Sequence, residues 1–412
     1  MSKLALHGGE PVRKAPPPEW PIHDDREAEA AARVARSGKW QYATGTEGTD
    51  LESEFAEWIG AGHAISTING TETMVIALKA AGVGPGDEVI MPTTTFVACP
   101  LAALLAGAVP VPVDIDQANL GIDPEAAEAA VTDRTRVLMP VHLGGIPADL
   151  DAVMAIAERH DLVVLEDTAQ AQGTEWKGQK VGSIGDFGSF SFQTAKTMVS
   201  GDGGMITTND AALADLCRSY RQFGNPQKEA GHSFTVTGGN YRMSEFVAAV
   251  LRVQLSRVHE LIDRRTGSAE YLDRRLGDLP GILPTMLDER VTRCSYLSYS
   301  MNYDAEKLDG VHRDVFLRAL SAEGISVRTG YTTLVHEMAL TNGENLRSED
   351  LRRFTGRNIQ AAKEGAFPNA ENARSNTTMW MRQNFLLGDQ DVLDDVVRAV
   401  HKVVENIGEL RG

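Results

Sequence analysis

The sequence predicts an α/β protein with a mostly parallel sheet covered by helices on both faces. Short apolar segments typical of strands alternate with helical segments between Ala64 and Glu166. Alternation at this spacing implies right-handed crossovers between parallel strands. Polar motifs follow several of these strands, and ligands of parallel sheets bind at the carboxyl ends of the strands. The predicted fold therefore also predicts where the functional site lies.

The N-terminal part is predicted to be an extended arm followed by two helices. Five prolines in the first twenty-one residues exclude a regular helix there, and an arm of this kind is a candidate for contact with a partner subunit. Helical periodicity begins near Asp25 and returns in LESEFAEWIG, residues 51–60. The intervening KWQYATGTEG, residues 39–48, is predicted to be a loop within reach of a ligand.

Five strands and four helices are then expected in alternation. The predicted strands are AISTI, EVIMP, VPVPVD, RVLMPV and LVVLE, with helices from Thr71 and near residues 97–106, 124–131 and 149–160. A long periodic helix over 245–266 is expected to bridge domains or pack on another subunit. Beyond it, helices with short strands in SYLSYSMNY and GISVRTGY predict a smaller α+β domain. We therefore divide the chain into an arm (1–24), a large domain (25–265) and a small domain (266–412).

Composition narrows the class of protein. Apolar residues make up 42% of the chain and charged residues 24%, as in ordinary globular proteins, and the formal net charge of −17 argues against nucleic-acid or anionic-membrane partners. The three cysteines are widely spaced, so neither a disulfide framework nor a metal site is predicted. No signal peptide or membrane span is indicated, and we expect a cytoplasmic protein. GxGxxG after the early strands and GxxxxGK[ST] are both missing, which argues against nicotinamide or ATP.

One lysine and one carboxylate suggest the chemistry. Lys196 follows the strand-like run 187–192 and precedes a glycine-rich turn. A lysine at a strand end can be desolvated, which lowers its pKa and supplies the uncharged amine that a Schiff-base nucleophile needs. Taken alone, such a lysine is more often an exposed surface residue. However, Asp167 ends the buried run LVVLE, where a carboxylate can keep a pyridinium nitrogen protonated. The pair suggests pyridoxal 5'-phosphate.

Six motifs carry a resemblance to a known family. They are NGTETM (69–74), PTTTFVAC (92–99), VHLGGIPADL (141–150), EDTAQAQG (166–173), FSFQTAKTMVSGDGG (190–204) and GGNYRMSEF (238–246). In these motifs and their order the chain resembles the DegT/StrS sugar and cyclitol aminotransferases, including the aminocyclitol and aminohydroxybenzoate-synthase branch. The resemblance implies fold type I of the pyridoxal-phosphate enzymes and a homodimer with shared active sites. It also implies glutamate or glutamine as amino donor, and a keto-sugar or cyclitol ketone as acceptor in natural-product biosynthesis.

The turn 69–72 is the predicted phosphate site. It joins a strand to a helix, and helix N-termini offer backbone N–H donors to phosphate, although a simple N-cap fits the same residues. The resemblance implies that Gly70, Thr71 and Glu72 hold the phosphate through backbone amides. Ser191 and Gln193, which alternate onto one face of a strand, are expected to add side-chain hydrogen bonds.

The resemblance also implies contacts to the cofactor ring and to a second subunit. Phe96 would stack on the pyridine ring, whereas its spacing alone favours a core phenylalanine. Gln170 would contact the ring or its 3'-oxygen. Asn240 would reach the phosphate of the neighbouring subunit. His142 and Arg242 are not assigned to catalysis, because either could satisfy a core or interface polar group.

Three other functions compete with transamination, in which Lys196 would move a proton and Asp167 would hold the ring nitrogen protonated. The same family motifs serve enzymes that aromatise an amino-cyclohexenone. Relatives that dehydrate deoxysugars replace the lysine with histidine, so Lys196 argues against that activity. A regulatory relative that does not turn over a substrate would not need the full set of cofactor-binding residues, so their presence argues against that function.

The chain also departs from the family pattern at several positions. Asp202 replaces a glutamate, Gln172 stands where histidine is common, and Met379–Leu387 carries Arg382 and Gln383 where cyclitol relatives often have histidines. The last departure leaves the substrate open.

Overall fold

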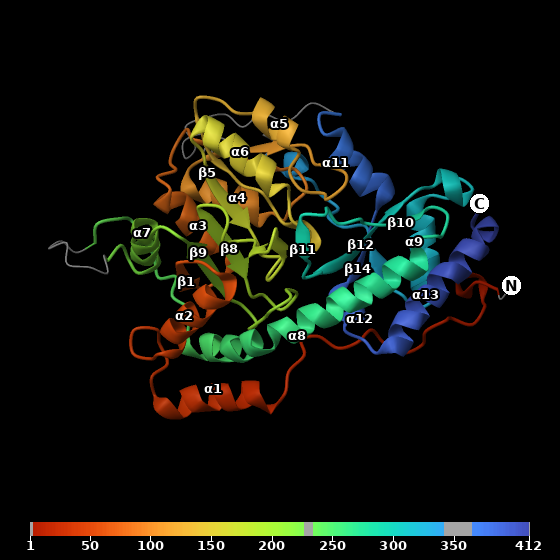
Figure 1. Ribbon diagram of the computed structural model, residues 1–412, viewed down its shortest axis with the longest axis horizontal. Helices are drawn as coiled ribbons and strands as arrows, with labels where there is room; N and C mark the ends of the chain where they lie inside the picture. Colours follow the sequence, from red (N-terminus) through yellow and green to blue (C-terminus); the bar gives the residue numbers. More distant parts are fainter. Residues whose placement is uncertain (1–2, 226–233, 342–364, 412) are drawn as a thin grey trace.

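A seven-stranded sheet forms the centre of the larger part of the molecule in the computed structural model, which describes residues 3–225, 234–341 and 365–411 (Figure 1). All five predicted strands are present. The spatial order is β1 (His63–Thr67), β9 (Gly204–Thr208), β8 (Phe187–Ser191), β5 (Val163–Asp167), β4 (Thr135–Leu138), β2 (Glu88–Pro92) and β3 (Val109–Val113). Only β9 runs against the other strands of this sheet. The predicted α/β class with a mostly parallel sheet is confirmed.

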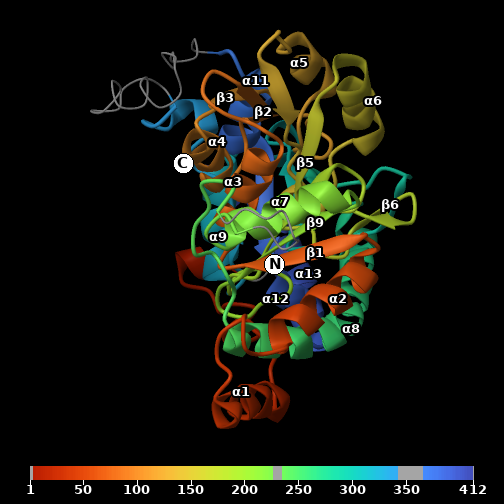
Figure 2. The same ribbon diagram turned by 90° about the vertical axis from the view of Figure 1, so that its left-hand side faces the viewer.

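Helices cover both faces of this sheet, because successive strand residues point to opposite sides. On one face, Val89 and Met91 pack among the residues of α3 (Gly70–Ala80), α4 (Ala98–Ala106) and α7 (Ala211–Arg221). On the other face, Ile90 packs with α5 (Pro124–Ala129) and α6 (Leu150–His160). The helices α2 (Glu47–Ile59) and α8 (Glu245–Leu276) also pack on this second side, through the cluster that contains Ala64 and Phe190. Figure 2 shows both helices below β1, with α1 (Asp25–Ser37) beneath α8.

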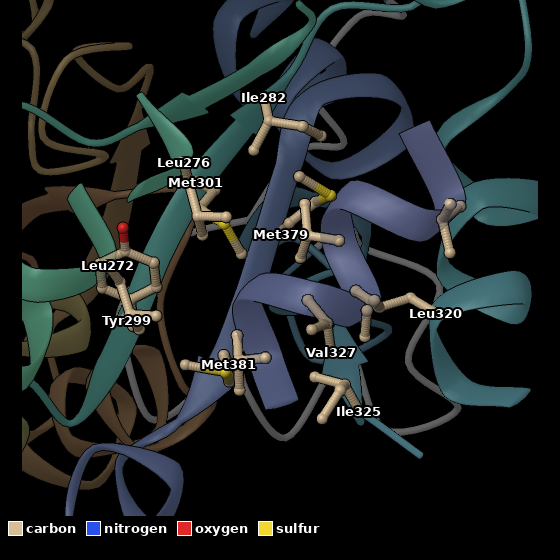
Figure 3. Close-up of a cluster of buried hydrophobic side chains, with 14 of the residues drawn as sticks. Leu272, Leu276, Ile282, Tyr299, Met301, Leu320, Ile325, Val327, Met379 and Met381 are labelled. Atoms are coloured by element: carbon tan, nitrogen blue, oxygen red, sulfur yellow. The ribbon is translucent and has the colours of Figure 1, made fainter. Parts of the chain in front are cut away.

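The helix α8 (Glu245–Leu276) joins the two parts of the molecule (Figure 1). Its first half packs against α2 and the sheet through Leu251, Leu255 and Val258. Its second half enters the core of the C-terminal part through Leu272 and Leu276 (Figure 3). The predicted helix ended near Thr266, whereas the observed one is ten residues longer, because the apolar spacing continues into the second core. The division of the chain after residue 265 stays a prediction.

The C-terminal part contains a four-stranded antiparallel sheet in the order β10 (Ile282–Pro284), β12 (Ser298–Tyr303), β14 (Thr378–Arg382) and β13 (Val327–Arg328). One face of this sheet packs on α8, α9 (Arg313–Ala322) and α13 (Gln390–Glu405), and Figure 3 shows Met379 and Met381 pointing into that core. The predicted smaller α+β part is thereby confirmed as a fold class. Its opposite face looks toward the larger part of the molecule.

The N-terminal arm lies along its own chain's C-terminal part (Figure 1). Leu4 is fully buried in the core there, and Arg13 forms an ion pair with Asp395 at 3.0 Å. The backbone N–H of Val12 donates to Glu323, which also binds Lys402. In this chain the arm is therefore part of the surface of the C-terminal part, and its contact with a partner stays a prediction.

A buried polar network ties α2, β1 and α7 together. Arg221 is fully buried, and its Nη1 lies 2.5 Å from Oε1 of Glu52. Oε1 of Glu52 also accepts from the N–H and hydroxyl of Ser66, and the Tyr42 hydroxyl donates to Oε2. The Arg221 guanidinium stacks on the Tyr42 ring at 4.1 Å. Such a pair is costly to break on one side, because the remaining charge stays buried.

Among the described residues, no helix combines the length and apolar character needed to cross a bilayer. In the same part of the chain, no group of three or more His, Cys, Asp or Glu side chains is arranged to hold a metal ion. The three cysteines are buried and unpaired. The cytoplasmic location stays a prediction.

Candidate active site

A cleft of about 1020 Å³ opens at the carboxyl ends of the parallel strands, between the two parts of the molecule. It brings together eight of the ten predicted site residues: Gly70, Thr71, Phe96, Asp167, Gln170, Ser191, Gln193 and Lys196. Glu72 and Asn240 do not line it. The residues on its other wall come from the C-terminal part, and none of them has a role predicted from the sequence: Leu297, Ser298, Arg328, Gly330, Tyr331, Trp380, Arg382, Gln383 and Asn384.

Lys196 lies in the tight loop that follows β8. Its own N–H donates to the carbonyl of Gln193 at 2.8 Å, and its carbonyl accepts from Nε2 of Gln383 at 2.9 Å. Burial lowers the pKa of the Lys196 amine, and the nearby charge of Asp167 opposes this shift. The amine is therefore more readily uncharged at neutral pH than that of an exposed lysine.

The loop that carries Lys196, called here the lysine loop, is held in place by hydrogen bonds to Gln172, one of the departures from the family pattern. Its Nε2 donates to the carbonyl of Ser191 at 2.5 Å, and its Oε1 accepts from the N–H groups of Thr197 and Met198 at 3.2 and 3.3 Å. Gln172 is fully buried, so each bond is shielded from water. The side chain thus bridges the end of β8 and the residues after Lys196.

A second series of hydrogen bonds connects the lysine loop to α8. Arg265 is fully buried, and its Nη1 donates to Oε1 of Gln383, whose Nε2 binds the lysine loop. Burial lowers the pKa of Arg265 to about 9, which still leaves it charged at neutral pH. The position of Lys196 therefore depends on residues from both parts of the molecule.

Asp167 ends β5 and is 5% exposed. Its Oδ1 accepts from the N–H of Ala169 at 3.0 Å, and its Oδ2 accepts from Sγ of Cys99 at 3.1 Å. Burial, with the Asp167 charge beside it, raises the pKa of the Cys99 thiol well above its ordinary value, so this group is a neutral donor. These hydrogen bonds fix the orientation of the Asp167 carboxylate, which lines the cleft.

The turn before α3 fits a phosphate group. Asn69 caps the helix by accepting from the N–H of Glu72 at 2.9 Å, which leaves the N–H groups of Gly70 and Thr71 without an acceptor among the described residues. A Cβ on Gly70 would come within 2.6 Å of Cβ of Ser191. The glycine is therefore needed for this close approach, which places a hydroxyl beside free N–H donors at a helix N-terminus. The Glu72 amide is used within the chain, and its predicted role stays a prediction.

Aromatic rings line the cleft beside Asp167. Phe96 is 52% exposed, which is far from the core position that spacing alone favours, and its ring centre lies 6.3 Å from that of Tyr331. Gln170 accepts from the N–H of Gly144 at 3.0 Å and donates to the Tyr331 hydroxyl at 2.9 Å. Trp380 meets Tyr331 edge to face at 5.8 Å. A flat ring thus has apolar surface and a positioned amide in this part of the cleft.

The remaining sequence candidates lie apart from the cleft in a single chain. Asn240 is exposed and pairs with Gln222 through an isolated bridge, and residues 226–233 before it lie outside the described residues. Arg242 stacks over Phe223 at 5.1 Å. His142 is fully buried, and its Nδ1 accepts from the N–H of Ala148, so Nε2 donates to Glu166 at 3.0 Å. The expectation that His142 satisfies a core polar group is confirmed.

The residues that the C-terminal part contributes to the cleft were not predicted from the sequence. Tyr331 and Arg328 stand in GISVRTGY, which was assigned only as a strand, and Trp380 precedes the noted Arg382. Trp20 of the arm also lines the cleft and donates from Nε1 to the carbonyl of Thr194 at 2.8 Å. Two arginines and two aromatic residues in the short segments around Arg328 and Arg382 were the available signal. Their contact with the parallel sheet, however, is set by tertiary packing.

The cleft thus combines a partly desolvated lysine, a buried carboxylate and the free N–H groups of a helix N-terminus at the carboxyl ends of a parallel sheet. The chain belongs to the DegT/DnrJ/EryC1/StrS aminotransferase family, whose model matches residues 21–354. The resemblance of the six motifs is thereby confirmed.

Named relatives narrow the comparison. The chain is 35% identical to the L-glutamine:2-deoxy-scyllo-inosose aminotransferase of Micromonospora echinospora, with 100% of each chain covered. It is 41% identical to the 3-amino-5-hydroxybenzoate synthase of Amycolatopsis mediterranei, but over 69% of this chain and 74% of that protein. The crystal structure of a 3-amino-5-hydroxybenzoic acid synthase superposes with a TM-score of 0.84 at 32% identity, covering 95% of this chain and 100% of the other.

Proposed function

We propose that this protein is a pyridoxal-phosphate-dependent aminotransferase that moves an amino group from glutamine or glutamate to a cyclitol ketone or keto-sugar. The observation that carries the proposal is the pairing of the desolvated Lys196 with the buried, oriented Asp167 in one cleft. The glycine cradle at Gly70 and the ring-sized space beside Phe96 fit the phosphate and the ring of that cofactor.

The bound cofactor would supply an aldehyde for an amine and a ring that accepts electrons from the donor's α-carbon. Lys196 would bind that aldehyde and, once displaced by the donor, carry a proton away from the donor's α-carbon. Asp167 would hold a proton at the ring nitrogen, since its carboxylate is buried and kept in orientation by Cys99 and Ala169. Gln172 and Gln383 would keep the lysine loop in place.

The full-length likeness to a glutamine-dependent cyclitol aminotransferase supports this donor and acceptor class. The aromatising activity on an amino-cyclohexenone is the second candidate, because the likeness to the benzoate synthase is close although it covers less of the sequence. The folds do not separate the two, since the synthase structure superposes over nearly the whole chain. Amino transfer needs a donor and releases a 2-oxo acid, whereas aromatisation does neither.

The first prediction tests the lysine. The protein supplied with pyridoxal phosphate should be yellow, and borohydride should fix a cofactor-sized mass on the peptide that contains Lys196. L-Glutamine added first should bleach the colour and prevent the fixation, with release of the 2-oxo acid. The matched control is Lys180→Ala, a lysine outside the cleft, which should be labelled at Lys196 like the native protein. A colourless protein without the adduct would refute the cofactor assignment.

We also propose that two chains share each site. Asn240 is exposed and lies outside the cleft of its own chain, which is the position expected of a residue that serves a neighbour. A hydrogen bond to a charged group contributes about 1.5–3 kcal/mol, so Asn240→Ala should weaken cofactor binding roughly tenfold to a hundredfold without unfolding the chain.

Mixing Lys196→Ala with Asn240→Ala protein tests this sharing. Under subunit exchange, each mixed dimer would carry one site with both changes and one site with neither. Activity at limiting cofactor should therefore exceed that of either parent. Mass spectrometry of tagged chains shows whether subunits have exchanged. If they have exchanged and activity does not recover, each chain builds its own site.

A further inference from the structure

The end of the N-terminal arm forms part of the rim of the cleft. Nδ2 of Asn384, in the short helix α12 (Gln383–Leu386), donates to the carbonyl of Pro18 at 2.7 Å. Nε1 of Trp20 donates to the carbonyl of Thr194 in the lysine loop at 2.8 Å. Figure 1 shows the arm passing α12 on its way to α1. Residues 18–20 therefore reach from the C-terminal part to the lysine loop, and their anchors hold the Trp20 ring at the cleft.

The Trp20 ring offers the cleft a second aromatic surface. Phe96, Tyr331 and Trp380 form one series of ring contacts beside the predicted position of the cofactor ring. Among the described residues, no ring contact joins Trp20 to any of these three side chains. Trp20 is partly buried, and its one polar atom is already bonded to Thr194. What remains for a ligand is therefore the flat apolar face of the indole.

Two hydrogen-bond acceptors lie beside the anchors of the arm. Oδ1 of Asn384 is buried and has no donor among the described residues, although its Nδ2 is bonded to the arm. On the other side, the N–H of Thr194 donates to the carbonyl of Gly201 at 3.1 Å, which brings the turn with Asp202 to the same rim. The exposed carboxylate of Asp202 lines the cleft and can only accept hydrogen bonds. A buried acceptor without a donor costs free energy, so a hydroxyl group of a ligand would stabilise Oδ1 of Asn384.

We propose that Trp20, Asn384 and Asp202 form the subsite for the polyhydroxylated six-membered ring of the amino acceptor. The inference rests on the proposed function and applies to a cyclitol ketone and to a keto-sugar alike, because both rings carry C–H groups on their faces and hydroxyl groups around their rim. The C–H face packs on the indole, and the hydroxyl groups donate to the carboxylate and amide oxygens. The amino donor is a flexible chain without a ring, so it would leave the Trp20 face uncovered.

The test measures binding without turnover. scyllo-Inositol and UDP-glucose, which carry no ketone, are titrated by calorimetry into the protein supplied with pyridoxal phosphate. Trp20→Ala should weaken the binding of at least one of them about tenfold, the loss expected when roughly 50 Å² of apolar contact is removed. Trp20→Phe keeps an aromatic face and lacks only the bond to Thr194, so its loss should be smaller. Asp202→Ala should weaken the same ligand about twofold to tenfold, as for one neutral hydrogen bond.

Trp40→Ala is the matched control. Trp40 is 57% exposed and lies outside the cleft, and its Nε1 also donates to a backbone carbonyl, that of Ala35. This variant should bind both ligands like the native protein. Weaker binding of scyllo-inositol in Trp20→Ala identifies the ring as a free cyclitol, whereas weaker binding of UDP-glucose alone identifies it as a linked sugar. Either result supports the subsite.

The reaction with L-glutamine separates this inference from the proposed function. Weaker polyol binding in Trp20→Ala supports the subsite even if L-glutamine never bleaches the cofactor, in which case only the proposed function fails. If L-glutamine reacts but Trp20→Ala binds both ligands like Trp40→Ala, the subsite is wrong and the proposed function stands. A native protein that binds neither ligand overturns the proposal, and so does a Trp20→Phe variant that binds as weakly as Trp20→Ala. The assignment to the acceptor is also overturned if Trp20→Ala raises the L-glutamine concentration for half-maximal bleaching as much as it weakens polyol binding.

Discussion

Asp167→Asn should lower the rate of the half-reaction with L-glutamine by roughly 10²–10⁴-fold while the protein still binds the cofactor and turns yellow. A neutral amide cannot stabilise a protonated ring nitrogen, and proton-holding groups of this kind contribute that order of rate. The amide nearly matches the carboxylate in shape, so the fold should persist although residue 167 is only 5% exposed. Stopped-flow absorbance of the cofactor measures the rate directly.

Cys99→Ala is the matched control for this prediction. It removes the neutral donor that lies 3.1 Å from Oδ2 of Asp167 but leaves the charge and the bond from Ala169. We expect a loss of about tenfold or less, as for one neutral hydrogen bond. If Asp167→Asn reacts no more slowly than Cys99→Ala, another group holds the ring nitrogen.

Arg221→Met should destabilise the folded protein by about 3–5 kcal/mol, because it leaves the carboxylate of Glu52 buried without its partner. The change lies outside the cleft, so activity per folded molecule should be retained. A urea titration followed by circular dichroism measures the loss of stability as a lower midpoint.

Arg218→Met on the same helix is the control, since its pair with Asp215 is partly exposed. Such pairs contribute about 0.3–0.5 kcal/mol, so its urea midpoint should stay near that of the native protein. Equal midpoints for the two variants would mean that water reaches Glu52 and solvates its charge.

The larger part of the molecule was predictable from sequence because its strands are buried on both faces. Runs such as LVVLE and EVIMP are apolar except for one terminal glutamate each, and all five predicted strands and the helices between them are present. The short strand β9 was not predicted, since GMITT follows a glycine-rich turn and carries no strong pattern. The antiparallel pairing of β9 with β1 and β8 is a tertiary contact that the local sequence does not encode.

The candidate site was predictable where its residues follow strands of the parallel sheet. Lys196, Asp167 and Gly70 belong to strand ends of one sheet, and parallel topology alone brings them together. Arg328 ends a two-residue strand in the other sheet, and Tyr331 follows it by three residues. Their approach to Lys196 depends on how the two parts of the chain dock. The role of Gln172 in binding the lysine loop likewise depends on three backbone groups more than eighteen residues away.

The continuous helix α8 has a consequence for how this chain tolerates length changes. It runs roughly 48 Å from one hydrophobic core to the other. One residue added in its middle would turn everything beyond it by about 100° and advance it by about 1.5 Å. Leu272 and Leu276 would then leave their core, and Arg265 would leave Gln383 and the lysine loop. An insertion at Gly82, which is exposed and where an added Cβ would meet no atom within 4 Å, should disturb neither core. The chain should therefore tolerate a change of length at such turns but not along α8.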